Sequence, residues 1–332
     1  MRCWVLLLAA GCAARECTTI DDVLMSLSSD NACTSLYLER GGVGDEGVRV
    51  LASVLQADTA LKSVSLPSSG MSDDGARALA KALKTNRGLL SLDLGHNKIG
   101  LEGIEALADA LKINTMLSTL NLFQNMIGAK GATALAEALK HSKALTSVNL
   151  VFNNIGADGA KALAEALQTN TALLSLNLRM NVIGDEGAIA LAEALRAKHS
   201  VVSFLGVQGN SIGLEGARAL AATLTTNSAL AVLELRDNPI GNDGVAALAE
   251  ALKINNGLTS LTIKSSSIRD EGARVLAEAL KSNSALTELK LKSAYMSDEA
   301  RKEVYDVLAV PPGQRRRHFG KDELGRTAND EL

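Results

Sequence analysis

Aromatic residues and proline are scarce in this sequence. Phe, Trp and Tyr together make up 2% of the 332 residues, and there are 4 Pro and 4 His. No apolar run reaches the roughly 18 residues that a membrane-spanning helix needs, so no membrane span is expected. The formal net charge of -3 lacks the basic excess that phosphate backbones select, which argues against nucleic-acid binding. The His residues show no metal-ligand spacing, and we expect no metal and no cofactor.

The remaining composition, 47% hydrophobic and 21% charged, is that of a folded chain, and its dominant feature is an internal repeat. Segments such as LNLFQN recur every 28 residues, with one interval of 29. A period between about 20 and 50 residues is typical of stacked architectures. The position of the Asn in LNLFQN has equivalents at Gly41, Ser69, Asn97, Asn125, Asn153, Asn181, Asn210, Asn238, Ser266 and Ala294.

Each unit reads as LxxLxLxxNxIGxxG followed by a stretch such as ARALAKALKTN. The first half alternates apolar and polar residues, as at Leu176 and Leu178, which predicts a short strand with one buried face. In the second half Ala160, Leu163 and Leu167 follow the spacing of an amphipathic helix. The sequence therefore predicts an α/β solenoid of about ten 28-residue strand-turn-helix units, with a parallel strand ladder on the concave side and helices on the convex side.

Asn occupies the marker position in six consecutive central units. It stands where the chain leaves the strand and turns inside the stack, so its amide can pair with backbone groups that would otherwise be buried without partners. The two units at each end lack this Asn, which is typical of terminal repeats with a neighbour on one side only. The predicted structural row is Asn97, Asn125, Asn153, Asn181, Asn210 and Asn238.

The pattern LSLDLGHNKIGLEGIEALADALKIN resembles the ribonuclease-inhibitor-type leucine-rich repeat, which is also found in NOD-like receptors and in Ran GTPase-activating protein. The match covers about residues 33 to 309. The resemblance implies a curved horseshoe that binds proteins chiefly on its concave strand face. The sequence has no Gly-rich nucleotide-binding loop, so the resemblance to NOD-like receptors is to their repeat region. No catalytic or GTPase-contacting residue of the Ran activator maps onto a position here.

The concave positions of repeats four to seven carry several apolar side chains. Strand alternation points the residues that flank the strand leucines, and the residue before the Asn, toward the concave face. Apolar clusters with a polar rim are typical of binding sites. For Phe152 and Phe204, folding into the core is the alternative. The predicted partner-binding residues are Phe123, Val151, Phe152, Arg179, Met180, Phe204, Gln208 and Arg236.

Basic residues gather at the far end of the same face. Lys264, Lys290 and Lys292 occupy concave positions of the last units. They form either a solvated face or a contact for an acidic partner.

The two ends of the chain carry a localisation signal of their own. Residues 1–14, MRCWVLLLAAGCAA, have the layout of a short secretory signal peptide. The last four residues, NDEL, are a variant of the terminal ER-retention signal. We therefore expect the endoplasmic reticulum lumen or the secretory pathway, with a cytoplasmic location as the alternative. The 20 Asn include no N-x-Ser/Thr sequon, and LAAGC also resembles a bacterial lipid-attachment site at Cys12.

Cys17 and Cys33 flank a half-unit that would cap the first repeat. They form either two buried thiols or a disulfide, which would contribute about 3 kcal/mol by closing a loop of about 15 residues. The predicted organisation is a signal peptide at 1–14, an N-terminal cap at 15–32, repeats at 33–309 and a disordered tail at 310–332, which is rich in Pro, Gly and charge.

No catalytic arrangement of side chains is evident, and we expect a monomeric, non-enzymatic module that binds a protein partner through its concave face. The alternative is a regulator, either an activator or an inhibitor, of a GTPase or hydrolase. Such a regulator would act as Ran GTPase-activating protein or ribonuclease inhibitor does.

Overall fold

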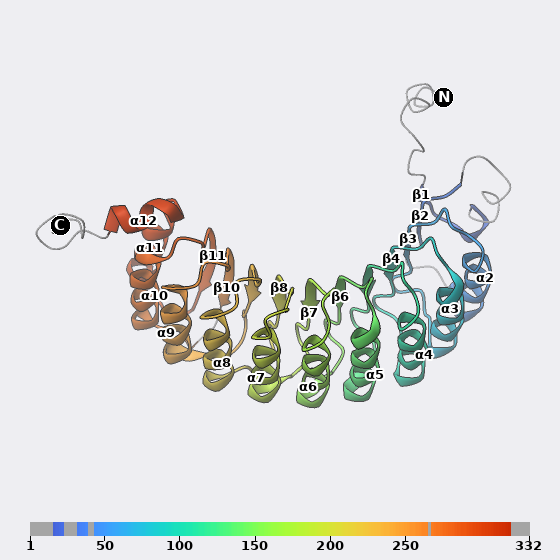
Figure 1. Ribbon diagram of the computed structural model, residues 1–332, viewed down its shortest axis with the longest axis horizontal. Helices are drawn as coiled ribbons and strands as arrows, with labels where there is room; N and C mark the ends of the chain where they lie inside the picture. Colours follow the sequence, from blue (N-terminus) through green and yellow to red (C-terminus); the bar gives the residue numbers. More distant parts are fainter. Residues whose placement is uncertain (1–15, 23–31, 39–42, 265–266, 320–332) are drawn as a thin grey trace, which may run out of the picture.

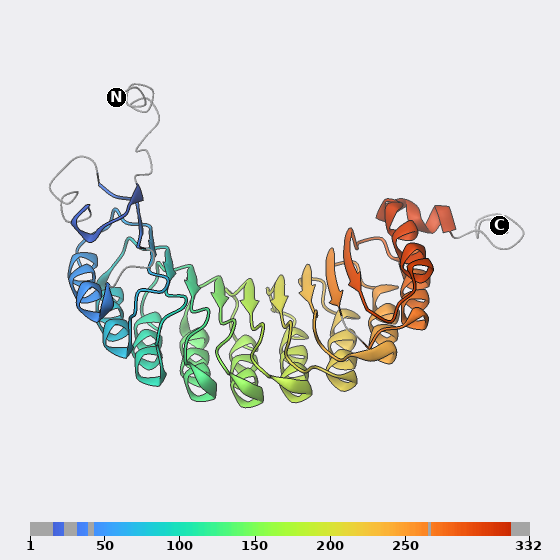
Figure 2. The ribbon, with the colours of Figure 1, turned by 180° about the vertical axis from the view of Figure 1, so that it is seen from behind.

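The computed structural model describes residues 16–22, 32–38, 43–264 and 267–319. Its strands form one parallel sheet of eleven strands, ordered β1 to β11 as in the chain. The strands line the inner side of an arc and the helices cover its outer side (Figure 1), as the view from behind also shows (Figure 2). The predicted solenoid of strands and helices is confirmed. The predicted signal peptide and the terminal NDEL lie outside the described residues.

The strands are β1 Glu16–Cys17, β2 Ser35–Tyr37, β3 Ser63–Ser65, β4 Ser91–Asp93, β5 Thr119–Asn121, β6 Ser147–Asn149, β7 Ser175–Asn177, β8 Phe204–Gly206, β9 Val232–Glu234, β10 Ser260–Lys264 and β11 Glu288–Lys292. The helices are α2 Gly44–Leu55, α3 Asp73–Thr85, α4 Leu101–Leu111, α5 Gly128–His141, α6 Gly156–Leu167, α7 Gly184–Leu195, α8 Leu214–Leu224, α9 Gly241–Leu252, α10 Asp270–Ser282, α11 Asp298–Ala309 and α12 Pro312–Phe319.

Equivalent positions of successive repeats pair with each other in the sheet. Leu176, at the centre of β7, lies beside Val148 of β6 and Leu205 of β8. All three are buried, whereas Ser175 and Asn177 on either side of Leu176 are partly exposed. Because side chains alternate along a strand, this register sends the central residues toward the helices and the flanking residues toward the inner face.

The helices bury the stripe that the sequence predicts. In α6 the buried residues include Ala160, Leu163 and Leu167. Small residues bring neighbouring helices close, since a Cβ added to Gly159 would lie 3.0 Å from the Cβ of Ala132 in α5. Gly156, at the start of α6, has a φ of 66°, a conformation that strains a residue with a side chain.

The Asn row joins neighbouring repeats through buried amides. Asn181 is fully buried, and its Nδ2 donates to the carbonyls of Leu150 and Leu178 at 2.8 and 2.9 Å. Its Oδ1 accepts from the backbone N–H groups of Asn153 and Ile155 at 2.9 and 3.2 Å. Each such amide satisfies turn backbone that has no strand partner.

A second row of buried Asn lies where each helix leads into the next strand. Asn86 Nδ2 donates to the carbonyls of Leu55 and Asp58 at 2.6 and 2.8 Å, and its Oδ1 accepts from the N–H of Leu89 at 2.8 Å. This row was not predicted, although the recurring KTN and KIN segments carry it at the same period. Its members are Asn86, Asn114, Asn170, Asn227, Asn255 and Asn283.

The N-terminal cap is tied to the first repeat. Cys17 and Cys33 are buried and joined by a disulfide, with their Cα atoms 6.0 Å apart. Strand β1, which contains Cys17, pairs with β2.

The predicted disorder of the tail is wrong for residues 312–319, which form α12. Arg315 of this helix is fully buried. Its Nε and Nη2 donate to the carbonyls of Val310 and Leu308 at 2.9 and 3.3 Å, at the C-terminal end of α11. A cation is favourable there because the last carbonyls of a helix lack partners and carry partial negative charge. Composition alone did not reveal this specific contact.

Candidate partner-binding surface

The inner face of the sheet is hollowed toward its C-terminal half. The hollow, which we call the inner groove, has a volume of about 520 Å³ and is open to solvent. Five of the predicted partner-binding residues line it, namely Phe123, Val151, Arg179, Gln208 and Arg236. The other lining residues are Asn149, Asn177, Glu234, Thr262 and Lys290.

Three Asn at the ends of β5, β6 and β7 have amides of fixed orientation. The Oδ1 of Asn121, Asn149 and Asn177 each accepts from the backbone N–H two residues further along, at 3.0, 3.1 and 3.2 Å. Since only the oxygen of an amide can accept, these bonds leave each NH2 group as the donor. Within the described part of the chain these NH2 groups donate no hydrogen bond, so the inner face presents a row of amide donors.

Aromatic rings are in contact at the N-terminal side of the groove. Phe123 lies edge-on to His96, with ring centroids 4.4 Å apart, and to Phe152, with centroids 5.9 Å apart. Edge-to-face pairs of this kind are favourable. Phe152 is nevertheless 41% exposed.

Several apolar residues near this cluster have left-handed backbone. Phe152, Met180 and Val182 have φ of 56°, 57° and 56°. For bulky or β-branched residues this conformation is a genuine outlier, with a cost of about 1–3 kcal/mol each. Their exposed fractions are 41%, 38% and 63%, so burial in the core does not explain why these residues are present.

Two exposed apolar residues extend the cluster along the edge where strands lead into helices. Met126 is 69% exposed and directly follows Asn125 of the first Asn row. Val182 directly follows Asn181 of the same row. We call Phe123, Met126, Phe152, Met180 and Val182 together the apolar ledge. Met126 and Val182 were not predicted, because they stand two positions beyond the last one assigned to the concave face.

Charged groups occupy the C-terminal half of the groove. Gln208 Nε2 donates to Glu234, Arg236 pairs with Asp237 at 2.9 Å, and Lys290 pairs with Glu288 at 2.9 Å. Burial raises the pKa of Glu234, and the charges of Lys290 and Arg179 oppose that rise. A partly desolvated carboxylate thus lies among cations.

The family described as Leucine Rich repeat matches residues 85–108, 114–136, 141–164, 169–192 and 226–249. This chain contains leucine-rich repeats. No curated protein sequence matches it.

Three of the solved structures similar to this chain show identities below 25%. Leiomodin-1 Actin-Binding Site 2 is 24% identical, covers 48% of this chain and 91% of its own, and has a TM-score of 0.42. The tropomodulin C-terminal domain of Caenorhabditis elegans is 21% identical, covers 48% of this chain and 96% of its own, and has a TM-score of 0.41. The Rad7 and Elc1 complex in yeast is 16% identical, covers 78% of this chain and 69% of its own, and has a TM-score of 0.46. No residue role is carried over from them.

Two predicted partner-binding residues are less exposed than expected. Val151 lines the groove but is only 5% exposed, at the position that the longer side chains of Phe123 and Arg179 occupy in the adjacent repeats. Phe204 is half-buried at the start of β8, beside Ser175. It makes no ring contact with the aromatic cluster of the described residues, because it stands at the opposite end of the strand.

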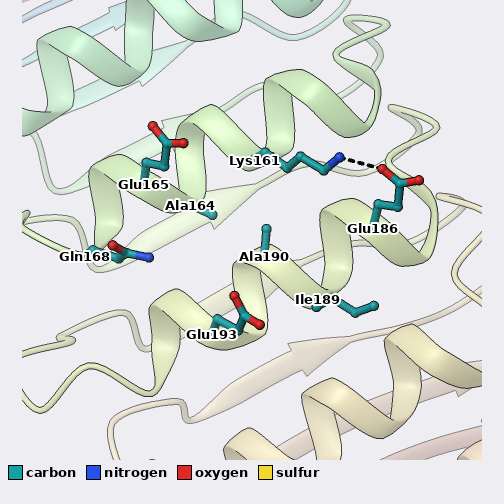
Figure 3. Close-up of a pocket in the computed structure, with 8 residues that line it drawn as sticks. All are labelled: Lys161, Ala164, Glu165, Gln168, Glu186, Ile189, Ala190 and Glu193. Carbon is teal, nitrogen blue, oxygen red and sulfur yellow. Dashed lines mark hydrogen bonds and ion pairs between the residues drawn. The ribbon is translucent and has the colours of Figure 1, made fainter.

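The outer face of the repeats also has a groove, between α6 and α7 (Figure 3). Lys161 bridges it by pairing with Glu186, and Glu165, Gln168 and Glu193 border it. These are exposed or half-exposed polar groups on a solvated helix face. Within the described ranges, no cluster of His, Cys, Asp or Glu could hold a metal ion, and no helix is long and apolar enough to cross a bilayer.

Proposed function

We propose that this chain is a non-enzymatic module that binds a protein partner through its inner face, centred on repeats four to seven. The observation that carries the proposal is the apolar ledge. Its residues Phe152, Met180 and Val182 are apolar and exposed. Exposed apolar clusters are typical of protein contacts.

We further propose that the repeats are of the ribonuclease-inhibitor type. The 28-residue period supports this, as does a full helix of 11 to 14 residues in each repeat from α2 to α11. For the compartment we propose the endoplasmic reticulum lumen or the secretory pathway. The disulfide between Cys17 and Cys33 supports an oxidising environment, since cytosolic proteins rarely keep disulfides.

Site-specific photo-crosslinking tests the binding face. A benzoylphenylalanine in place of Met126, which is 69% exposed on the ledge, should cross-link a partner protein in an extract of the native host. The same group in place of Ile113, which is 54% exposed on a helix-to-strand connection, serves as the control. Equal cross-linking from both positions would contradict the proposal.

The double substitution Phe123→Ala and Phe152→Ala should abolish that cross-link. Phe152 is exposed, so the melting temperature should change by only a few degrees, about the effect of one half-buried ring. A loss of many degrees, measured by circular dichroism, would show instead that the two rings belong to the core.

A further inference from the structure

We propose that the inner groove binds an extended acidic segment of the partner, with an apolar side chain of that segment seated on the apolar ledge. This inference rests on the proposed function and adds the chemistry of the ligand. Four observations on the groove support it, namely its donors, its charge, its length and one unpaired acceptor.

The groove is rich in hydrogen-bond donors. Asn149 and Asn177 line it, and Asn121 stands at the same position on the preceding strand. Each directs its NH2 group away from the backbone N–H group that its oxygen accepts. They recur once per strand, and each can bond a carbonyl or a carboxylate. The acceptor surface that matches them is a peptide backbone with acidic side chains.

The charge of the groove is complementary to that of an acidic segment. Arg179, Arg236 and Lys290 line it, and Lys264 pairs in register with Lys292 on the next strand. Among the described residues, Arg179, Lys264 and Lys292 form no ion pair. The five cations of this part of the face outnumber its three carboxylates, which are Glu234, Asp237 and Glu288. The inner face is therefore locally cationic although the whole chain has a net charge of -3.

The length of the surface fits a short extended segment. Phe123 stands two residues after the end of β5, and Lys292 ends β11, six strand spacings away. At about 4.8 Å per spacing this is about 29 Å, or about nine extended residues. The apolar ledge lies at one end of this span and the unpaired lysines at the other. The segment should therefore have its apolar residue at one end and its carboxylates toward the other.

One acceptor in the groove has no partner. Gln208 donates through Nε2 to Glu234, but its Oε1 is buried and has no hydrogen-bond partner among the described residues. A buried acceptor requires a donor. The backbone N–H groups of a bound peptide are donors of this kind.

Fluorescence polarisation with the full chain tests the proposal. The probe is a fluorescein-labelled peptide of about nine residues, with Leu and Trp at one end and mostly Glu after them, made in both sequence directions. At about 0.05 M salt it should bind about tenfold more tightly than its counterpart with Gln in place of Glu, and screening should weaken it toward 1 M salt, where the Debye length is about 3 Å.

Charge reversal in the groove identifies the site. Arg236→Glu combined with Lys290→Glu should weaken the acidic peptide about tenfold or more. Arg274→Glu, at a residue 62% exposed on α10, makes the same kind of change on the outer face and should leave affinity within about twofold. Circular dichroism melts confirm that each variant is folded.

Several outcomes would overturn the inference. These are equal binding of the Glu and Gln peptides, unchanged affinity in the double charge reversal, tighter binding of a single-stranded oligonucleotide of the same length, and a groove-dependent dimer in sedimentation. If cross-linking of the partner still depends on Phe123 and Phe152 but is unchanged by the charge reversal, the proposed function stands and this inference fails. If cross-linking is unchanged in both sets of variants, both the proposed function and this inference fail.

Discussion

At the scale of single residues, a glycine substitution at a left-handed position can test stability and binding separately. Phe152 has a φ of 56°, and the equivalent position in the seventh repeat is Gly209, with a φ of 62°. Glycine adopts this conformation without strain. Phe152→Gly should therefore leave the free energy of unfolding within about 1 kcal/mol of the parent, as relief of strain offsets the lost ring contact.

The same variant should bind the partner and the acidic peptide more weakly, because its ring is exposed on the apolar ledge. Denaturant melts and polarisation titrations measure the two effects separately. The matched control is Gln124→Gly. Gln124 also has left-handed backbone, with a φ of 52°, and this variant should keep both stability and binding. A large loss of stability in Phe152→Gly would assign the ring to packing.

At the scale of helices, carboxylates of one repeat cap the helix of the next. Asp270, the first residue of α10, accepts from the backbone N–H and the hydroxyl of Ser297 at 2.7 and 2.9 Å, and Ser297 in turn caps α11. These two hydrogen bonds lower the pKa of Asp270 below its ordinary 3.8.

Because that pKa is lower in the folded chain, the unfolded chain binds the proton first as pH falls. The contribution of Asp270 to stability is then complete above pH 3.8 and is lost as pH falls through the lowered pKa. Asp270→Asn should lower the melting temperature at pH 6, and the difference from the parent should shrink in acid. Asp243→Asn, at an exposed residue of α9, is the control. A difference that stays constant with pH would exclude this role for the Asp270 charge.

At the scale of the whole molecule, the compartment can be tested by mass. The non-reducing intact mass of the protein from its native host should show loss of about 14 N-terminal residues and a deficit of about 2 Da for one disulfide. A full-length chain with all thiols free would refute the secretory proposal and favour a cytoplasmic location. Neither result bears on the inner groove, whose geometry does not involve the two ends.

The sequence by itself determined the repeat, the parallel sheet and the first Asn row. Periodicity carries these features, because the repeats are nearly identical and each contacts only its neighbours. It also placed Phe123, Phe152, Met180 and Arg179 on one face.

Tertiary structure alone decided which of those side chains reach solvent. Val151 is buried, and Phe204 stands at the opposite end of its strand from the aromatic cluster. Met126 and Val182, each directly after an Asn of the first row, are exposed. Exposure at a given position depends on the sizes of neighbours 28 residues away and on local φ. A one-dimensional pattern of apolar residues records neither. The sequence therefore predicted which face binds, whereas the structure was needed to decide which side chains are exposed on that face.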